Sequence, residues 1–156
     1  MEEHGIKVLH ADGDADQLIA NTAVVCAKTH ITQVIGEDTD VFQLLVSQLI
    51  SDSKGLYMIT DKQNAKYPCL DIQAIRSKLG EEIAPILPVL HAISGCDTTS
   101  KLFGIGKSTV MNKIHLLAEE AKHFLSPSVT HKQIEESGRK ILCVIYDENN
   151  VNFKFK

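Results

Sequence analysis

The chain has 156 residues, of which 44% are hydrophobic and 23% are charged, and its formal net charge is −4. This length and composition predict one globular domain with a sizeable core and exclude a disordered segment. No apolar run reaches the roughly 20 residues that a membrane-spanning helix needs. The acidic net charge also argues against a general nucleic-acid coat protein, whose surface is basic.

Charge and cysteine usage narrow the class further. Residues 1–60 carry 3 lysines and arginines against 9 aspartates and glutamates, while residues 61–156 carry 13 against 11. The histidines show no HxxxH or HExxH arrangement, and the cysteines form no CxxC pair. We therefore expect an intracellular protein with reduced cysteines, mostly in the core, rather than zinc ligands or disulfides. The cysteines are Cys26, Cys69, Cys96 and Cys143.

Strand-like and helix-like segments alternate in the first half of the chain. We expect strands over residues 6–10, 31–36 and 55–60, and helices from Asp14 or Asp12, over 41–50 and over 71–79. The first helix is expected to bury an apolar face made by Leu18, Ile19, Thr22, Val25 and Cys26. Gly80 closes the third helix. This alternation predicts a parallel α/β sheet.

After Gly80 the pattern becomes helical. Residues 83–94 are almost wholly apolar and predict a buried helix, in which Pro85 fits the first turn and Pro88 introduces strain. Further helices are expected over 98–102, 107–117, 118–125 and 132–147. The tail 151–156 is interpreted as a terminal strand or a frayed end. The predicted architecture is an α/β core with a helix-turn-helix over residues 1–117, extended by a helical segment, 118–156, of the same domain.

Three acidic clusters lie beside apolar runs, where solvated carboxylates are not expected to gather. Carboxylates are costly to remove from water unless they are paired or bind a metal. If the fold brings the clusters together, they form an oxygen-rich site for one or two Mg²⁺ or Mn²⁺ ions. The clusters are Asp12-Gly13-Asp14-Ala15-Asp16, Asp38-Thr39-Asp40 and the single Asp97.

The sequence contexts suit such a site. Asp38 and Asp40 follow the strand at 31–36, and ligands collect at the carboxyl ends of parallel strands. Asp14 and Asp16 would share an ion only at a helix start, because two steps inside a helix point to opposite faces. Asp97 follows Gly95, which lets the chain turn sharply.

Of two other interpretations of the acids, helix capping stays open and a calcium-binding loop fails. Taken alone, each pair is better explained as a helix N-cap. A calcium-binding loop beginning at Asp12 fits poorly, because Gln17 and Ala23 stand where such a loop needs Gly and Glu.

In order and context these motifs resemble the PIN-like nucleases of the flap-endonuclease branch. The resemblance covers roughly residues 10–115 and rests on three ordered motifs. They are Asp14-Ala15-Asp16, Glu37-Asp38-Thr39-Asp40, and Gly95-Cys96-Asp97 followed by Leu102-Phe103-Gly104-Ile105-Gly106-Lys107. The string from His91 to Ser100 is more similar still to uncharacterised, often transposon-associated animal proteins with a PIN-like domain.

The resemblance implies metal-dependent cleavage of DNA or RNA phosphodiesters at flaps, junctions or single strands. It assigns metal coordination and catalysis to Asp14, Asp16, Asp38, Asp40 and Asp97. It also implies an earlier strand that ends in an aspartate, yet only nine residues precede His10. We therefore expect either a piece of a longer chain or a protein that has lost ligands and activity.

The glycine-rich segment after Asp97 is not a P-loop, because Lys101 stands where that motif needs glycine. We interpret it as the turn of a helix-turn-helix whose backbone N–H groups bind a phosphate, with an ordinary turn as the alternative. The expected nucleic-acid contacts are Lys101, Gly104, Gly106, Lys107 and Lys113.

The leading hypothesis is a metal-dependent, structure-specific nuclease domain, intracellular and nuclear, with no membrane partner. The alternative is a catalytically inactive PIN-like module that binds nucleic acid or protein. A third hypothesis is an incomplete gene product with no independent biochemical role.

Overall fold

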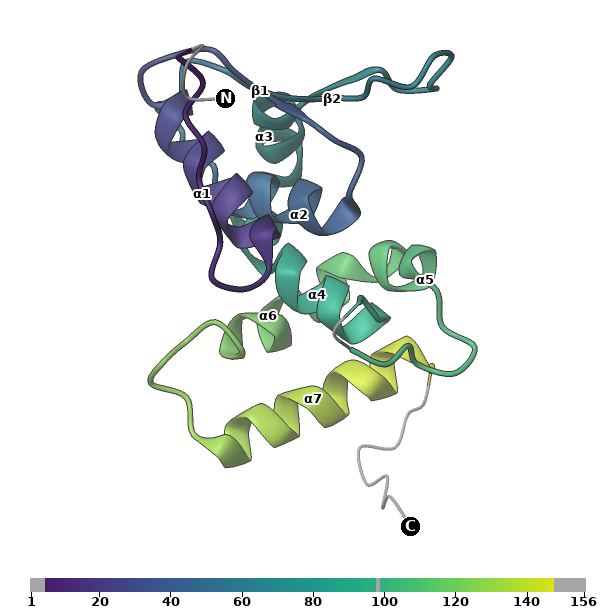
Figure 1. Cartoon of the computed structure of the whole chain (residues 1–156). Helices are drawn as coiled ribbons and strands as arrows, with labels where there is room; N and C mark the ends of the chain where they lie inside the picture. Colours follow the sequence, from purple (N-terminus) through teal and green to yellow (C-terminus); the bar gives the residue numbers. More distant parts are fainter. Residues whose placement is uncertain (1–4, 98, 148–156) are drawn as a thin grey trace. The chain divides into compact units, whose positions relative to one another are not determined.

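The computed structural model describes residues 5–97 and 99–147, and the chain divides into two compact units, Met1–Ile75 and Arg76–Lys156. The division falls inside helix α3 (Ile72–Ile83), within the segment 1–117 that the sequence predicts to be one core. Residues 118–147 therefore belong to the second unit together with residues 76–117 (Figure 1).

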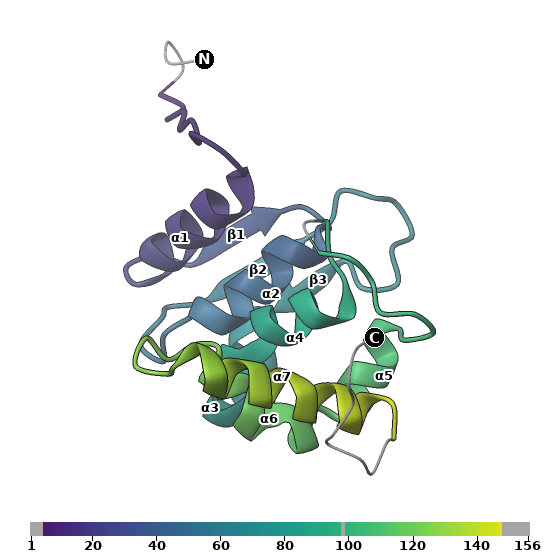
Figure 2. The same cartoon turned by 90° about the horizontal axis from the view of Figure 1, so that it is seen from below.

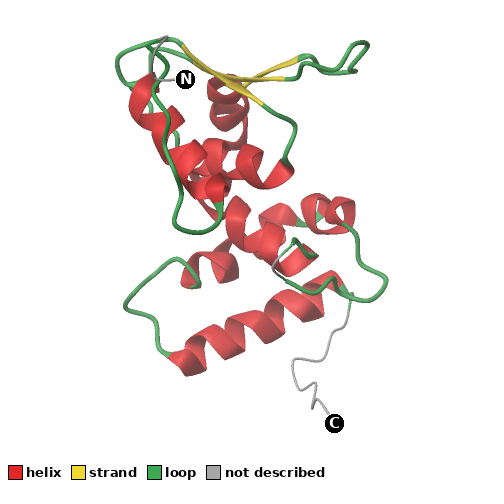
Figure 3. Cartoon of the chain, in the orientation of Figure 1, coloured by secondary structure: helices red, strands yellow, loops and turns green. Residues whose placement is uncertain are grey.

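The first unit is a small mixed α/β structure. Its elements are α1 (Ala15–Ala27), β1 (Thr32–Ile35), α2 (Thr39–Gln48), β2 (Leu56–Ile59) and β3 (Cys69–Asp71). Strands β1 and β2 are parallel, with Thr32 opposite Leu56, and β3 runs antiparallel to β2. Helix α1 contacts both parallel strands and packs along α2, and both helices lie on the same side of the sheet (Figures 1 and 3).

The sequence placed most of these elements but not all. The strand predicted over 6–10 is absent: these described residues are exposed and have no regular secondary structure. The sequence also missed β3, whose three residues join the sheet antiparallel at its end, so the sheet is mixed rather than wholly parallel (Figure 2).

Helix α1 buries a different face from the expected one. Ala20, Ala23, Val24 and Ala27 are buried, at the i, i+3, i+4, i+7 spacing of one helix face. Val25, predicted to be buried, is 61% exposed. Small side chains let α1 approach α2 closely, so the alanine stripe and not the stripe of larger residues faces the core.

The second unit is helical. After α3 it contains the 3₁₀ helix η2 (Ala84–Ile86), α4 (Leu87–Ser94), α5 (Lys107–Asn112), α6 (Ile114–His123) and α7 (His131–Ile145). Helix α4 contacts η2, α5 and α6, and α6 packs along α7. The core is formed by fully buried side chains that include Ile83, Ile86, Leu90, Val110, Leu117, Ile141 and Ile145.

The continuous helix predicted over 83–94 is broken at its second proline. Pro85 and Pro88 each lie in the first turn of a short helix, η2 and α4. Since a proline inside a helix removes a hydrogen bond and clashes with the preceding turn, a new helix starting at Leu87 removes the strain that Pro88 would cause.

Two later helix boundaries also differ from the prediction. The chain breaks at Lys113 (φ −104°, ψ 8°) between α5 and α6, not between residues 117 and 118. No helix forms over residues 99–102, which the structure describes, while Thr98 and the tail 151–156 lie outside the described residues.

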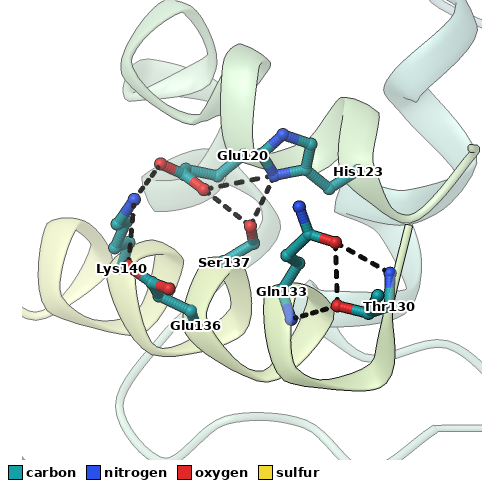
Figure 4. Close-up of polar contacts among 7 residues, drawn as sticks. All are labelled: Glu120, His123, Thr130, Gln133, Glu136, Ser137 and Lys140. Atoms are coloured by element: carbon teal, nitrogen blue, oxygen red, sulfur yellow. Dashed lines mark hydrogen bonds and ion pairs between the residues drawn. The ribbon is translucent and has the colours of Figure 1, made fainter. Parts of the chain in front are cut away.

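A network of polar side chains joins α6 to α7 (Figure 4). Ser137, which is 2% exposed, donates to Glu120 Oε2 at 2.7 Å, and His123 Nδ1 lies 2.6 Å from the Ser137 oxygen. Lys140 Nζ lies 3.0 Å from Glu120 Oε1. Because a hydroxyl has one hydrogen, the Ser137 bond to Glu120 leaves His123 Nδ1 as the donor to Ser137. The network makes Glu120 the polar centre of the α6–α7 contact.

We expect the stability of the α6–α7 contact to depend on the charge of Glu120. Burial raises the pKa of Glu120, but the Ser137 hydroxyl, the Lys140 ammonium and His123 together lower it more. Because its pKa is lower in the folded state, the carboxylate stabilises the fold at pH values above its unfolded pKa. This contribution is lost as the pH falls through the folded-state pKa. Glu120→Gln should lower the free energy of unfolding near pH 7 by about 1 kcal/mol and flatten its acid dependence.

Urea unfolding measured over a pH series tests this. Glu119→Gln is the matched control, because Glu119 is 78% exposed and pairs only across the surface with Lys122, a contact worth little. Equal effects of the two substitutions would contradict a special role for Glu120.

Candidate metal centre

Helices α1 and α2 begin in the same way. Asp14 caps α1 and accepts the backbone N–H of Asp16 at 3.1 Å. Asp38 caps α2 and accepts the backbone N–H of Asp40 at 2.8 Å. The capping interpretation is therefore correct for Asp14 and Asp38. Helix α2 begins two residues earlier than predicted, so Asp40 lies in its first turn rather than in extended chain.

Three of the predicted acids come together at these helix starts. Asp16, Asp38 and Asp40 each offer a carboxylate oxygen, and these oxygens lie within 4.8 Å of one another. Opposite ligands of a Mg²⁺ ion are about 4.2 Å apart, so small side-chain rotations bring the three onto one ion. A set made only of carboxylate oxygens fits a hard cation such as Mg²⁺ or Mn²⁺.

The helix starts also explain how these like charges are tolerated. The first backbone N–H groups of a helix carry partial positive charge, which stabilises carboxylates there. Asp38 is exposed, whereas Asp16 and Asp40 are half-buried, where repulsion between carboxylates is less screened. A cation among the three would remove that repulsion.

The neighbouring Glu37 has other partners. The Lys62 ammonium and the Thr60 hydroxyl both donate to its carboxylate, and these two hydrogen bonds, that from Lys62 the stronger, lower the pKa of Glu37. Glu37 is thus paired with Lys62.

Asp14 and Asp97 take different positions. Asp14 is exposed and, among the described residues, lies outside the group of three. Asp97 is exposed in the second unit, directly after the end of α4. There Gly95 has φ +93°, and Thr99 accepts the Cys96 N–H at 3.1 Å and donates to Ala92 O at 2.6 Å. The part of Asp97 in a metal site remains a prediction.

The glycine-rich segment forms an exposed loop before α5. Residues 101–106 line a hollow of ≈ 500 Å³, and Phe103 within it is 94% exposed. Tyr146 donates to Phe103 O at 3.0 Å, which ties the loop to the end of α7. The described residues between α4 and α5, 95–97 and 99–106, form no helix, which corrects the predicted short helix before a tight turn.

Lys113 has a structural role in the second unit. Its ammonium donates to Val144 O at 2.7 Å and Ile145 O at 3.1 Å, and pairs with Asp147 at 2.5 Å. It therefore satisfies the last carbonyls of α7, where a cation is favoured. These contacts engage the Lys113 ammonium within the second unit, and its contact with nucleic acid stays a prediction. Lys101 is exposed in the loop and Lys107 at the start of α5.

The cysteines are free as expected, but most of them are not in the core. Cys143 is buried, Cys96 is half-buried beside Thr99, and Cys26 and Cys69 are exposed. The prediction of a mostly buried set is wrong, because α1 turns its alanine face, not Cys26, inward.

Comparisons with known proteins leave the family open. No family model, no curated protein and no solved structure matches this chain. Within residues 5–97 and 99–147, no helix combines the length and apolar character needed to cross a bilayer.

Proposed function

We propose that the chain is a PIN-like nuclease domain that hydrolyses phosphodiester bonds of DNA or RNA with a divalent metal ion. The observation that carries the proposal is the meeting of Asp16, Asp38 and Asp40 at the starts of two packed helices. Asp16 is 22 residues from Asp38 in the sequence, so local structure gives these acids no reason to converge, whereas hydrolytic metal centres require it.

The residues have separate tasks in this proposal. Asp38 fixes the start of α2 through its bond to the Asp40 N–H, and so holds two carboxylates in register. Asp16 reaches the same point from α1. A Mg²⁺ or Mn²⁺ ion held there would supply an activated water and charge stabilisation for the leaving oxygen. Asp14 supports the centre by capping α1. A role of Asp97 in metal binding rests on the resemblance alone.

Nucleic acid is the proposed partner, with flap or single-stranded character, and the nucleus the proposed location. Support comes from the loop at 101–106, where Lys101 and Phe103 offer a cation and an exposed aromatic ring, and from Lys107, which is exposed at the start of α5. Such groups bind phosphates and stack on bases without reading sequence.

An inactive binding module is the second candidate. It is favoured by the capping roles of Asp14 and Asp38, which give both acids a structural reason to be present without a metal.

Cleavage of end-labelled 5′-flap, hairpin and single-stranded DNA and RNA distinguishes the two. We expect purified protein to cut at least one substrate with Mg²⁺ or Mn²⁺ and none with a chelator present. Folded protein that binds these substrates but leaves all of them intact would favour the inactive module.

A further inference from the structure

A second feature of the first unit lies beside the acids. A pocket of ≈ 520 Å³ opens beyond the carboxyl ends of β1 and β2, where Gly36 and Thr60 follow the two strands. Phe42, Met58 and Leu70 form its apolar lining. The position is the one where open α/β sheets bind ligands, and the volume is that of a small-molecule site.

The remaining wall is the loop between β2 and β3, which projects from the sheet (Figure 1). The two ends of this loop are joined by a hydrogen bond, because Thr60 donates its backbone N–H to Pro68 O at 3.2 Å. Glu37, just past β1, accepts from both the Thr60 hydroxyl and the Lys62 ammonium. These contacts fix the base of the loop before any ligand arrives, which lowers the entropy cost of ordering it on binding.

The loop brings a cation and an aromatic ring to the pocket mouth. Tyr67 lines the pocket, is 63% exposed, and has Lys66 Nζ at 5.1 Å from its ring centroid. An exposed tyrosine that continues an apolar pocket offers a flat surface on which a planar ring can stack. Because the Lys66 ammonium lies over one face of the tyrosine ring, a base would stack on the other face, with this positive charge beside it for the attached phosphate. Together these are the two parts of a sequence-tolerant site for single-stranded nucleic acid.

We propose that this pocket binds one nucleobase of a single-stranded nucleic acid, stacked on Tyr67, with the adjoining phosphate at Lys66. This base-binding role rests on the proposed nuclease function, which supplies the reason to bind a nucleic-acid strand. Glu37 and Thr39, which line the pocket, alternate along the chain with Asp38 and Asp40 of the metal centre. The pocket and two of the three carboxylates thus belong to the same short segment, so the proposed base site adjoins the metal centre along the chain. The substrate would be an unpaired strand, because a base inside a duplex cannot enter a pocket.

Binding of a fluorescein-labelled single-stranded oligonucleotide to the full chain tests the proposal. Ca²⁺ replaces Mg²⁺, and fluorescence anisotropy is the readout, so the result does not depend on cleavage. Stacking on an aromatic side chain is worth about 1–3 kcal/mol, so Tyr67→Ala should weaken binding at least about fivefold. Tyr67→Phe keeps the ring and should stay within about twofold of the unaltered protein. Lys66→Ala should lower the salt dependence of binding by about 0.7 in logarithmic slope, the contribution of one phosphate contact.

An oligonucleotide of the same length with abasic sites separates base from phosphate. It should bind the unaltered protein at least about fivefold more weakly than the ordinary strand, and should bind Tyr67→Ala with little further loss. Ile31→Ala is the protein control, because Ile31 is 71% exposed in the same unit but does not line the pocket. It should leave both affinities unchanged.

Three results would overturn the proposal. The first is equal affinity of the unaltered protein and Tyr67→Ala for the oligonucleotide. The second is equal affinity of the unaltered protein for the ordinary and abasic strands. The third is a free mononucleotide that binds as tightly as the oligonucleotide does. Displacement of the strand by a tyrosine-rich peptide at lower concentration than by competing strand would also reassign the pocket to a protein ligand. Each of these leaves the cleavage assay untouched, so failure of the pocket and failure of the nuclease are distinguishable.

Discussion

Asp38→Asn is expected to lower metal-dependent cleavage by roughly 100-fold or more while leaving α2 capped. Asparagine caps a helix about as well as aspartate, so the bond to the Asp40 N–H survives and only the charge is lost. The charge is what the ion requires, since Asp38 contributes one of the three carboxylate oxygens that lie within 4.8 Å. Cleavage rate of the best substrate in Mg²⁺ and Mn²⁺ is the first measurement.

Thermal unfolding with and without metal is the second measurement. A ligand that binds only the folded state at 100 times its dissociation constant stabilises it by about 2.7 kcal/mol, so Mg²⁺ or Mn²⁺ should raise the Tm of the unaltered protein. Asp38→Asn should lose most of that rise. In a chelator the same substitution should leave the Tm unchanged or raise it, because it removes repulsion among the three acids.

Asp14→Asn is the matched control. Asp14 caps α1 through the same type of contact, an i+2 N–H bond at 3.1 Å, yet lies outside the group of three among the described residues. It should retain most of the cleavage and of the metal-induced rise in Tm. If Asp38→Asn behaves like Asp14→Asn in both measurements, the acids are caps and the metal centre is refuted.

Gly95→Ala is expected to destabilise the second unit by about 3 kcal/mol or more. Gly95 has φ +93°, which residues with a side chain rarely adopt, and it ends α4. An added Cβ would lie 2.7 Å from Lys101 Cα and 2.9 Å from Lys101 Cβ. Because one of these atoms is backbone, the loop that carries Lys101 and Phe103 must move. Chemical denaturation gives the loss in stability.

Gly104→Ala separates backbone strain from this close contact. Gly104 also has a positive φ, +71°, but no atom lies within 4 Å of an added Cβ. It should lose only about 1 kcal/mol, the cost of a left-handed conformation for alanine. Equal losses at the two positions would show that Lys101 does not pack against Gly95.

The fold was predictable where the signal is local. Asp14 and Asp38 are good N-caps, and Thr32–Ile35 is rich in β-branched residues. Gly80 (φ 78°) interrupts the helical backbone inside α3. The first-half helices and parallel strands therefore follow from the sequence. Strand β3 was missed because its three residues are a strand only through pairing with β2. The buried face of α1 was wrongly predicted, because the distance between α1 and α2 decides whether small or large side chains face the core. The sequence of α1 alone does not contain that distance.

The same distinction between local and long-range contacts applies to the acidic residues. The sequence by itself determined that Asp14 and Asp38 start helices, since a cap needs only the next backbone N–H groups. It also supplied the carboxylates in a suggestive order. Only the tertiary structure decided which of them meet: the packing of α1 on α2 joins Asp16 to Asp38 and Asp40 and leaves Asp14 aside. No sequence motif predicts the pocket, because long-range contacts form it. The pairing of β2 with β3 brings Tyr67 and Phe42 to the same pocket, and hydrogen bonds to Glu37 hold the loop. A helix cap depends on neighbouring residues and can be predicted from the sequence, whereas a binding site depends on distances between remote residues that only the folded chain fixes.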